Sequence, residues 1–178
     1  MMKLGALAAT GYLIVWGFMQ PVMAACNPNM SRFRPDSRYE VVQGTGGVEV
    51  RDKVTSLVWK RCSLGMTWNG TTCTGAATQR TWQQALDAAR TATPSAVVGA
   101  SPWRLPNATE LHSLVERACY TPAINTTWFP ATPSNITWTS SPNKDASSST
   151  WALDFNDGSN DGYSKTSAYF VRLVRSDP

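Results

Sequence analysis

An acidic and amide-rich run near the C-terminus holds many side-chain oxygens: residues 154–162 are Asp-Phe-Asn-Asp-Gly-Ser-Asn-Asp-Gly. Such oxygens are the ligands that a hard cation such as calcium prefers, but the run departs from the EF-hand pattern, with Gly158 at its fifth position and Lys165 at its twelfth. The preferred interpretation is a tight Asp-Gly turn followed by a polar loop, with calcium as the alternative and no other cofactor. The candidate calcium ligands are Asp154, Asn156, Asp157 and Asp161.

Side chains that could perform catalysis are sparse. His112 is the only histidine, which excludes a metal site built from several histidines, and its place between Leu111 and Ser113 suggests the surface edge of a helix. Catalysis by a reactive thiol would need a cysteine outside any disulfide. We therefore expect a protein that is not an enzyme.

The first residues have the pattern of a secretory signal peptide. Lys3 is followed by an uncharged run over residues 4–19, then by Pro21 and the small-residue stretch Val22-Met23-Ala24. Cleavage after Ala24 would leave 154 of the 178 residues, enough for one domain, and the formal charge of +4 would fall to +3 with the loss of Lys3. We expect a secreted, periplasmic or surface protein without a membrane span after cleavage. A lipoprotein anchored through Cys26 is the alternative.

Four cysteines lie in the part of the chain that follows the signal. An even count in an exported chain indicates two disulfides. We favour a bond between Cys62 and Cys73, because the glycines and asparagine between them let the chain turn back. That leaves Cys26 to pair with Cys119. Zinc is the weaker alternative, since no two cysteines have the CxxC spacing.

Periodicity predicts an α+β fold in which two helices pack on short antiparallel strands with long loops. Strands are expected at 39–42, 48–52, 57–60, 136–140, 150–156 and 169–174. A capping box at Thr81 and Gln84 starts one helix, and Asn107 and Glu110 start a second that should end near Cys119. The predicted organisation is a signal peptide over 1–24, an arm with the first strand over 25–47 and one domain over 48–178.

Several short segments occur in the order found in one bacterial family. They include Leu-Val-Trp-Lys-Arg-Cys at 57–62, Trp-Arg-Leu-Pro at 103–106, Trp-Thr-Ser-Ser at 138–141 and Val-Arg-Leu-Val-Arg at 171–175. Together they resemble the Lcl C-terminal domain family, over about residues 48–175. That resemblance implies a fold related to C-type lectins and formylglycine-generating enzymes. It also implies an exported domain at cell surfaces, with glycosaminoglycan binding described for the adhesin that names the family.

Basic and aromatic residues supply the candidate contacts for an anionic glycan. Guanidinium groups match sulfate and carboxylate groups, and the predicted anion-binding residues are Arg32, Arg34, Arg38, Lys60, Arg61 and Lys144. Trp128 and Tyr163 lie in polar loops and are predicted to be exposed for sugar stacking. The other pattern-placed tryptophans are predicted to be core, namely Trp59, Trp82, Trp103, Trp138 and Trp151. For Arg104 and Arg172 two roles stay open: they could bind the ligand, or they could be structural partners of buried carboxylates or carbonyls.

The leading hypothesis from the sequence is a binding module of a bacterial envelope or surface that recognises anionic glycans. The second is an assembly subunit that binds another envelope or pilus protein. The third is an enzyme of the formylglycine-generating type, which the expected disulfides disfavour. Nucleic acid is not an expected partner.

Overall fold

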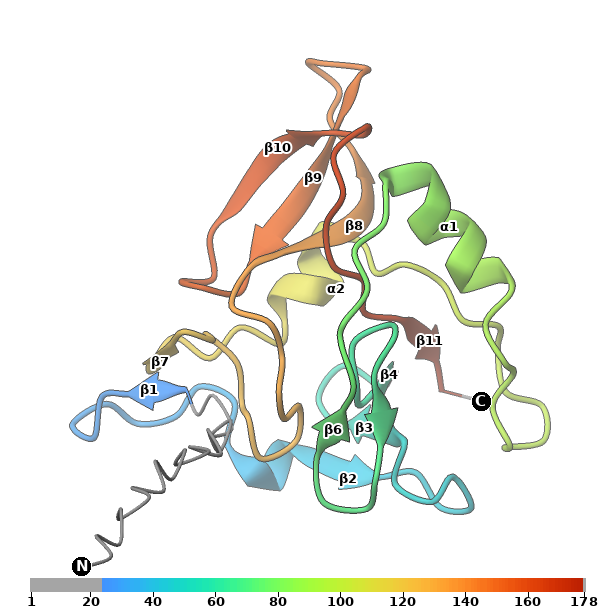
Figure 1. Ribbon diagram of the computed structural model, residues 1–178. Coiled ribbons are helices and arrows are strands. Elements are labelled where there is room, and N and C mark those ends of the chain that lie inside the picture. Colours follow the sequence, from blue (N-terminus) through green and yellow to red (C-terminus); the bar gives the residue numbers. More distant parts are fainter. Residues whose placement is uncertain (1–23, 178) are drawn as a thin grey trace, which may run out of the picture.

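Two antiparallel sheets form the framework of the protein, shown in the lower and upper halves of Figure 1. The computed structural model describes residues 24–177, so the predicted signal peptide lies outside the described residues apart from Ala24. The lower sheet has the strand order β11-β4-β3-β2, with β2 (Tyr39–Val41), β3 (Glu49–Asp52), β4 (Leu57–Lys60) and β11 (Val174–Ser176). The upper sheet has the order β10-β9-β8, with β8 (Ile136–Pro142), β9 (Ser149–Asp154) and β10 (Asn160–Ser164).

Two short strand pairs and three helical segments complete the fold. β1 (Ala25–Cys26) pairs with β7 (Cys119–Tyr120), and β5 (Thr67–Trp68) pairs with β6 (Cys73–Thr74). A 3-10 turn, η1 (Asp36–Arg38), precedes β2, and the α-helices are α1 (Trp82–Arg90) and α2 (Ala108–His112). Strands dominate, and the two α-helices among the described residues are compatible with the predicted α+β class. Within residues 24–177, no helix has the length and apolar character needed to cross a membrane.

The lower sheet is covered on both faces. Val58 belongs to a core cluster with Trp103 and the buried alanines of α1, whereas the next residue, Trp59, belongs to a second cluster with Leu111 of α2. Successive side chains of a strand point to opposite faces, so the two clusters mark the two faces of β4. Each face therefore excludes water.

Helix α1 begins as predicted, and helix α2 is shorter than predicted. Both have complete capping boxes, with Thr81 and Asn107 as caps. The predicted continuation of α2 to Cys119 is wrong, because the amide of Leu114 bonds back only three residues, to Leu111, and Glu116 leaves the helix. The Glu116 amide donates to Ala123 instead, and its carboxylate accepts the backbone amides of Phe33 and Arg34.

Both predicted disulfides are present. Cys26 bonds to Cys119, its register partner across β1 and β7, and Cys62 bonds to Cys73. The first bond attaches the start of the described chain to the main body. It also occupies the Cys26 sulfur, on which the lipid-anchor alternative depends.

Candidate functional site

Two of the six predicted anion-binding residues are engaged with the protein itself. Arg38 makes a bidentate ion pair with buried Asp52, with Nε to Oδ1 at 2.8 Å and Nη2 to Oδ2 at 2.5 Å. Arg34 directs its Nε at the carbonyl of Ser113, 2.5 Å away, and so satisfies the end of α2. Both guanidinium groups hold the N-terminal segment in place. The Arg38 guanidinium therefore has a structural partner in Asp52, and its ligand-binding role stays a prediction.

Two more of the six are exposed but far apart along the fold. Arg32 lies in the N-terminal segment, and Lys144 lies in the loop between β8 and β9. Figure 1 shows this loop at the opposite end of the molecule from β5 and β6, which follow Lys60 and Arg61 in the chain. The six residues therefore do not form one basic patch.

The predicted calcium ligands are held in local turns. The carboxylate of Asp154 accepts the amide of Asn156 at 2.8 Å, and that of Asp157 accepts the amide of Ser159 at 2.9 Å, which lowers the pKa of Asp157. Asp161 accepts the amide of Gly162. Between residues 24 and 177, no three acidic, histidine or cysteine side chains converge as they would around a metal ion. Residues 160–164 form strand β10 rather than the expected polar loop.

The predicted exposure of the aromatic side chains agrees with the structure for some residues and not for others. Trp128 and Tyr163 are half-buried rather than exposed: Trp128 packs against Tyr39, and Tyr163 against Tyr169 with ring centroids 5.2 Å apart. Trp59, Trp103 and Trp138 are core residues as predicted, and Trp82 is half-buried. The core prediction for Trp151 is wrong, since 37% of its surface is exposed. It points outward from β9 because the residues on either side of it, Thr150 and Ala152, are buried on the opposite face of that strand.

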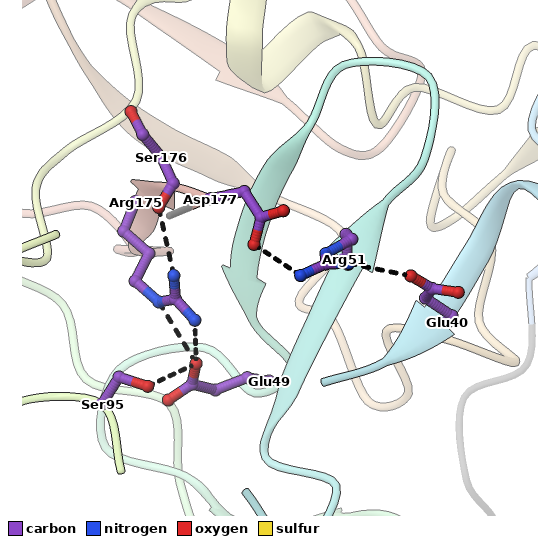
Figure 2. Close-up of polar contacts among 7 residues, drawn as sticks. All are labelled: Glu40, Glu49, Arg51, Ser95, Arg175, Ser176 and Asp177. Carbon is purple, nitrogen blue, oxygen red and sulfur yellow. Dashed lines mark hydrogen bonds and ion pairs between the residues drawn. The ribbon is translucent and has the colours of Figure 1, made fainter. Parts of the chain in front are cut away.

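A buried ion pair crosses β4 in the lower sheet, from the edge strand β11 to β3. Arg175 of β11 and Glu49 of β3 expose almost none of their side chains, and Arg175 directs Nη2 and Nε at Glu49 Oε2 across 2.9 and 3.2 Å. Ser95 donates its hydroxyl to the same carboxylate, as Figure 2 shows. At the exposed end of the same sheet, Arg51 reaches both Glu40 and Asp177. These cations are neutralised within the protein.

Arg172 is also buried; neutral acceptors satisfy its two terminal nitrogens, whereas its Nε has no partner among the described residues. Its two terminal nitrogens donate to the carbonyls of Lys60 and Arg61 and to the hydroxyls of Ser63 and Thr132. Burial lowers the pKa of Arg172 to about 9. The guanidinium thereby fixes the C-terminal end of β4, where the two remaining predicted residues lie: Lys60 is the last residue of β4 and Arg61 follows it.

A groove of about 670 Å³ opens beside that segment, between the β5–β6 hairpin and the C-terminal end of α1. Its lining contains two cations, Lys60 and Arg80, and the indole of Trp68. Hydroxyl groups complete the polar lining, from Ser63, Thr67, Thr78, Thr91 and Thr93. No acidic side chain is among the described residues that line it.

The two cations of the groove have no carboxylate partner among residues 24–177. Lys60 Nζ lies 4.4 Å from the centre of the Trp103 ring, and burial lowers its pKa. Among the described residues, the Arg80 guanidinium donates only to the carbonyl of Gln79, at 3.1 Å. A cation that stacks on an indole keeps its charge while its N–H donors remain open to an anion. The sequence does not single out Arg80, because only the fold brings it into the same groove as Lys60.

Local geometry holds the hairpin wall of the groove. The Cys62–Cys73 bond closes the loop that carries Trp68, and Gly65 turns the chain with φ of +90°. A side chain at Gly65 would collide with Thr78, so this position requires glycine. Trp68 in turn covers Gly47. The indole is therefore fixed by covalent and steric constraints rather than by its own strand of two residues.

No free thiol and no imidazole is among the described residues that line the groove. All four cysteines are in disulfides, and His112 lies on α2, where burial lowers its pKa. The groove offers cations, hydroxyls and an indole, which are groups that bind ligands.

Comparison with known families gives a match to one family model. The model of the Lcl C-terminal domain matches residues 48–175, which is more than half of the chain. No curated protein and no solved structure matches the chain. The match starts just before β3 and ends within β11, so it includes the upper sheet, the lower sheet apart from β2 and the end of β11, both α-helices and the groove. The chain belongs to the Lcl C-terminal domain family.

Proposed function

We propose that this protein is a non-catalytic binding module that works outside the cytoplasm and takes an anionic glycan in the groove beside Lys60. The observation that carries the proposal is the pair of unpaired cations, Lys60 and Arg80, in a groove whose described lining has no carboxylate. An anion entering this groove meets attraction from both cations and repulsion from no lining group.

The remaining lining suits a sugar. A flat indole face such as that of Trp68 matches the apolar face of a pyranose ring, and hydroxyl groups pair with sugar hydroxyls. The volume of about 670 Å³ lies within the range of small-ligand sites and suits a short oligosaccharide segment. A fold related to C-type lectins, which the family resemblance implies, is part of this proposal.

Export is supported by the cysteine chemistry. Two disulfides and no free cysteine among residues 24–177 are typical of proteins from oxidising compartments. The signal-peptide pattern of residues 1–24 agrees with that location. The absence of a free thiol in the described chain also speaks against the formylglycine-generating alternative, whose chemistry needs one.

Heparin chromatography of the full chain, exported with its own N-terminal segment, tests the proposal. The protein should be retained and elute in a salt gradient, and Lys60→Met and Arg80→Met should each weaken binding about tenfold, as expected for a lost charged hydrogen bond. Lys144→Met removes the same charge at the far end of the molecule and serves as the matched control.

Two outcomes would overturn the proposal. One is elution of the wild-type protein with a neutral protein of the same size. The other is an equal loss of retention in Lys144→Met and Lys60→Met, which would mean that net charge rather than the groove binds heparin. If the protein captured an envelope protein and bound no glycan, the assembly-subunit hypothesis would be favoured.

A further inference from the structure

Arg61 and Arg172 touch at the end of β4 but differ in their hydrogen bonds. Arg172 donates to two carbonyls and two hydroxyls. Arg61 exposes only 6% of its surface, yet its side chain makes no hydrogen bond or ion pair with any residue from 24 to 177. Its Nε is fully buried, while the two terminal nitrogens keep contact with solvent. The donor edge of Arg61 is therefore open.

Two indoles enclose the Arg61 guanidinium. Its Cζ lies 4.2 Å from the centre of the Trp68 ring and 5.4 Å from that of Trp128. Such contacts stabilise the cation without occupying its N–H groups. Burial lowers the pKa of Arg61 but leaves an arginine charged at neutral pH. The result is a fixed positive charge in an aromatic slot.

Other donors beside this slot are also unpaired. The indole Nε1 of Trp128 and the hydroxyl of Tyr39 are both buried without a partner, and the two rings lie 6.0 Å apart. Burial raises the pKa of Tyr39, so its hydroxyl stays protonated. Buried polar groups are nearly always hydrogen-bonded, so these two donors can take an acceptor that reaches the slot.

We propose that Arg61, between Trp68 and Trp128, is a second anion site that binds the carboxylate of an acidic sugar. A planar carboxylate can meet both terminal nitrogens in the plane of the guanidinium, where it fits between the rings. A tetrahedral sulfate is thicker and meets that edge less well. The inference rests on the proposed function in one respect: the ligand is a glycan.

The fold connects the two sites. Trp68 lines the groove and also stacks on Arg61. Lys60 belongs to the other face of β4, over Trp103, so the two cations serve different sites although they are adjacent in sequence. An oligosaccharide that lies in the groove can pass the edge of Trp68 and place an acidic residue at Arg61.

Calorimetric titration with an unsulfated oligogalacturonate of six residues tests the second site in the full exported chain. Wild-type protein should bind it, and Arg61→Met should weaken binding about ten- to a hundredfold, the loss expected for a charged bidentate contact. Arg61→Lys should also bind weakly, because a lysine keeps the charge but lacks the planar fork. Lys144→Met should bind like the wild type.

Ligand controls keep the test independent of any variant. The same hexamer with its carboxylates reduced to alcohols should bind wild-type protein at least tenfold more weakly. Equal binding of the reduced hexamer would overturn the inference, as would unchanged affinity in Arg61→Met. Equally tight binding of a hexaglutamate peptide would overturn the assignment to a sugar. Heparin retention that depends on Lys60 without any oligogalacturonate binding would remove this site and leave the proposed function standing.

Discussion

Arg175 and Arg61 are both more than nine-tenths buried, and they differ in what surrounds the charge. Arg175 meets the carboxylate of Glu49, which Ser95 also contacts. Arg61 meets two indole faces and no carboxylate among the described residues. A buried charge that is paired is part of the folding free energy, whereas one that is left without an anion is available to bind one. We call the buried Arg175–Glu49 pair the closed end of the lower sheet, because its charges are paired within the protein. We call the segment that follows β4 and carries Arg61 the open end, because its charge has no anion among the described residues.

The strongest test of the closed end is to break its ion pair. Glu49→Gln leaves Arg175 buried without a counter-charge, so the free energy of unfolding should fall by about 3–5 kcal/mol. Chemical denaturation at pH 7, followed by tryptophan fluorescence, measures this change as a shift of the midpoint.

Two variants serve as controls for Glu49→Gln, because neither leaves a buried charge without its partner. Glu40→Gln removes an ion pair whose side chains are about half-exposed, and it should change stability by less than about 1 kcal/mol. Arg61→Met loses no carboxylate partner and should also change stability by no more than about 1–2 kcal/mol, the size of its contacts with the rings. An effect of Glu49→Gln as small as these would contradict the division into a closed and an open end.

The open end depends on the Cys62–Cys73 bond. Replacing both cysteines with serine should lower the free energy of unfolding by roughly 3 kcal/mol or less, given the short loop, and should also abolish heparin retention because Trp68 and its hairpin lose their anchor. Thermal unfolding and heparin elution measure the two effects on one preparation.

Loss of the other disulfide, Cys26–Cys119, should lower stability without changing heparin binding. Replacing Cys26 and Cys119 with serine opens a much longer loop, so the loss of stability should be at least as large. The groove has no contact with this bond, and heparin elution should stay unchanged below the unfolding temperature. Retained binding after loss of Cys62–Cys73 would show that the hairpin does not form the site.

Local signals in the sequence predicted local structure. The capping boxes at Thr81 and Asn107 act within four residues, and the turn residues between Cys62 and Cys73 act within their own loop, so both helix starts and that disulfide follow from neighbouring residues. The sequence does not predict strand β10, because residues 160–164 lack an alternation of apolar and polar side chains. They pair with β9 through the backbone at the edge of the sheet.

The site itself could not be predicted in full, because it depends on contacts between distant segments. Alternation in β3 suggests that Glu49 faces solvent, but both faces of that sheet are covered, and Glu49 is buried. Arg61 was among the predicted anion-binding residues. Its enclosure by Trp128, 67 positions later in the chain, arises only from the fold. The same is true of Arg80, which shares the groove with Lys60.

The ion pair of Arg104 and Glu110 is intermediate between the closed and the open end, because it is paired but partly exposed to solvent. Arg104 binds both oxygens of Glu110 at 2.7 Å, and Glu110 also accepts the amide of Asn107 as part of the cap of α2. Burial alone would raise the pKa of Glu110, but the bonds from Arg104 and Asn107 outweigh it and lower that pKa below its usual range. A lowered pKa stabilises the fold above the unfolded-state pKa, and this contribution is lost as pH falls through the folded-state pKa.

Glu110→Gln should therefore reduce the free energy of unfolding by about 1 kcal/mol at pH 7, the size of a cap with a partly exposed ion pair. The difference from the wild type should shrink as pH falls toward 3, because the wild-type carboxylate becomes protonated. Gln84→Ala removes the equivalent cap residue of α1, which has no ionisable group, so its effect should not vary with pH. Denaturation midpoints of the wild type, Glu110→Gln and Gln84→Ala at pH 7, 5, 4 and 3 measure these differences in stability. A gap between Glu110→Gln and the wild type that stays constant over this range would show that the charge of Glu110 contributes nothing beyond its hydrogen bonds.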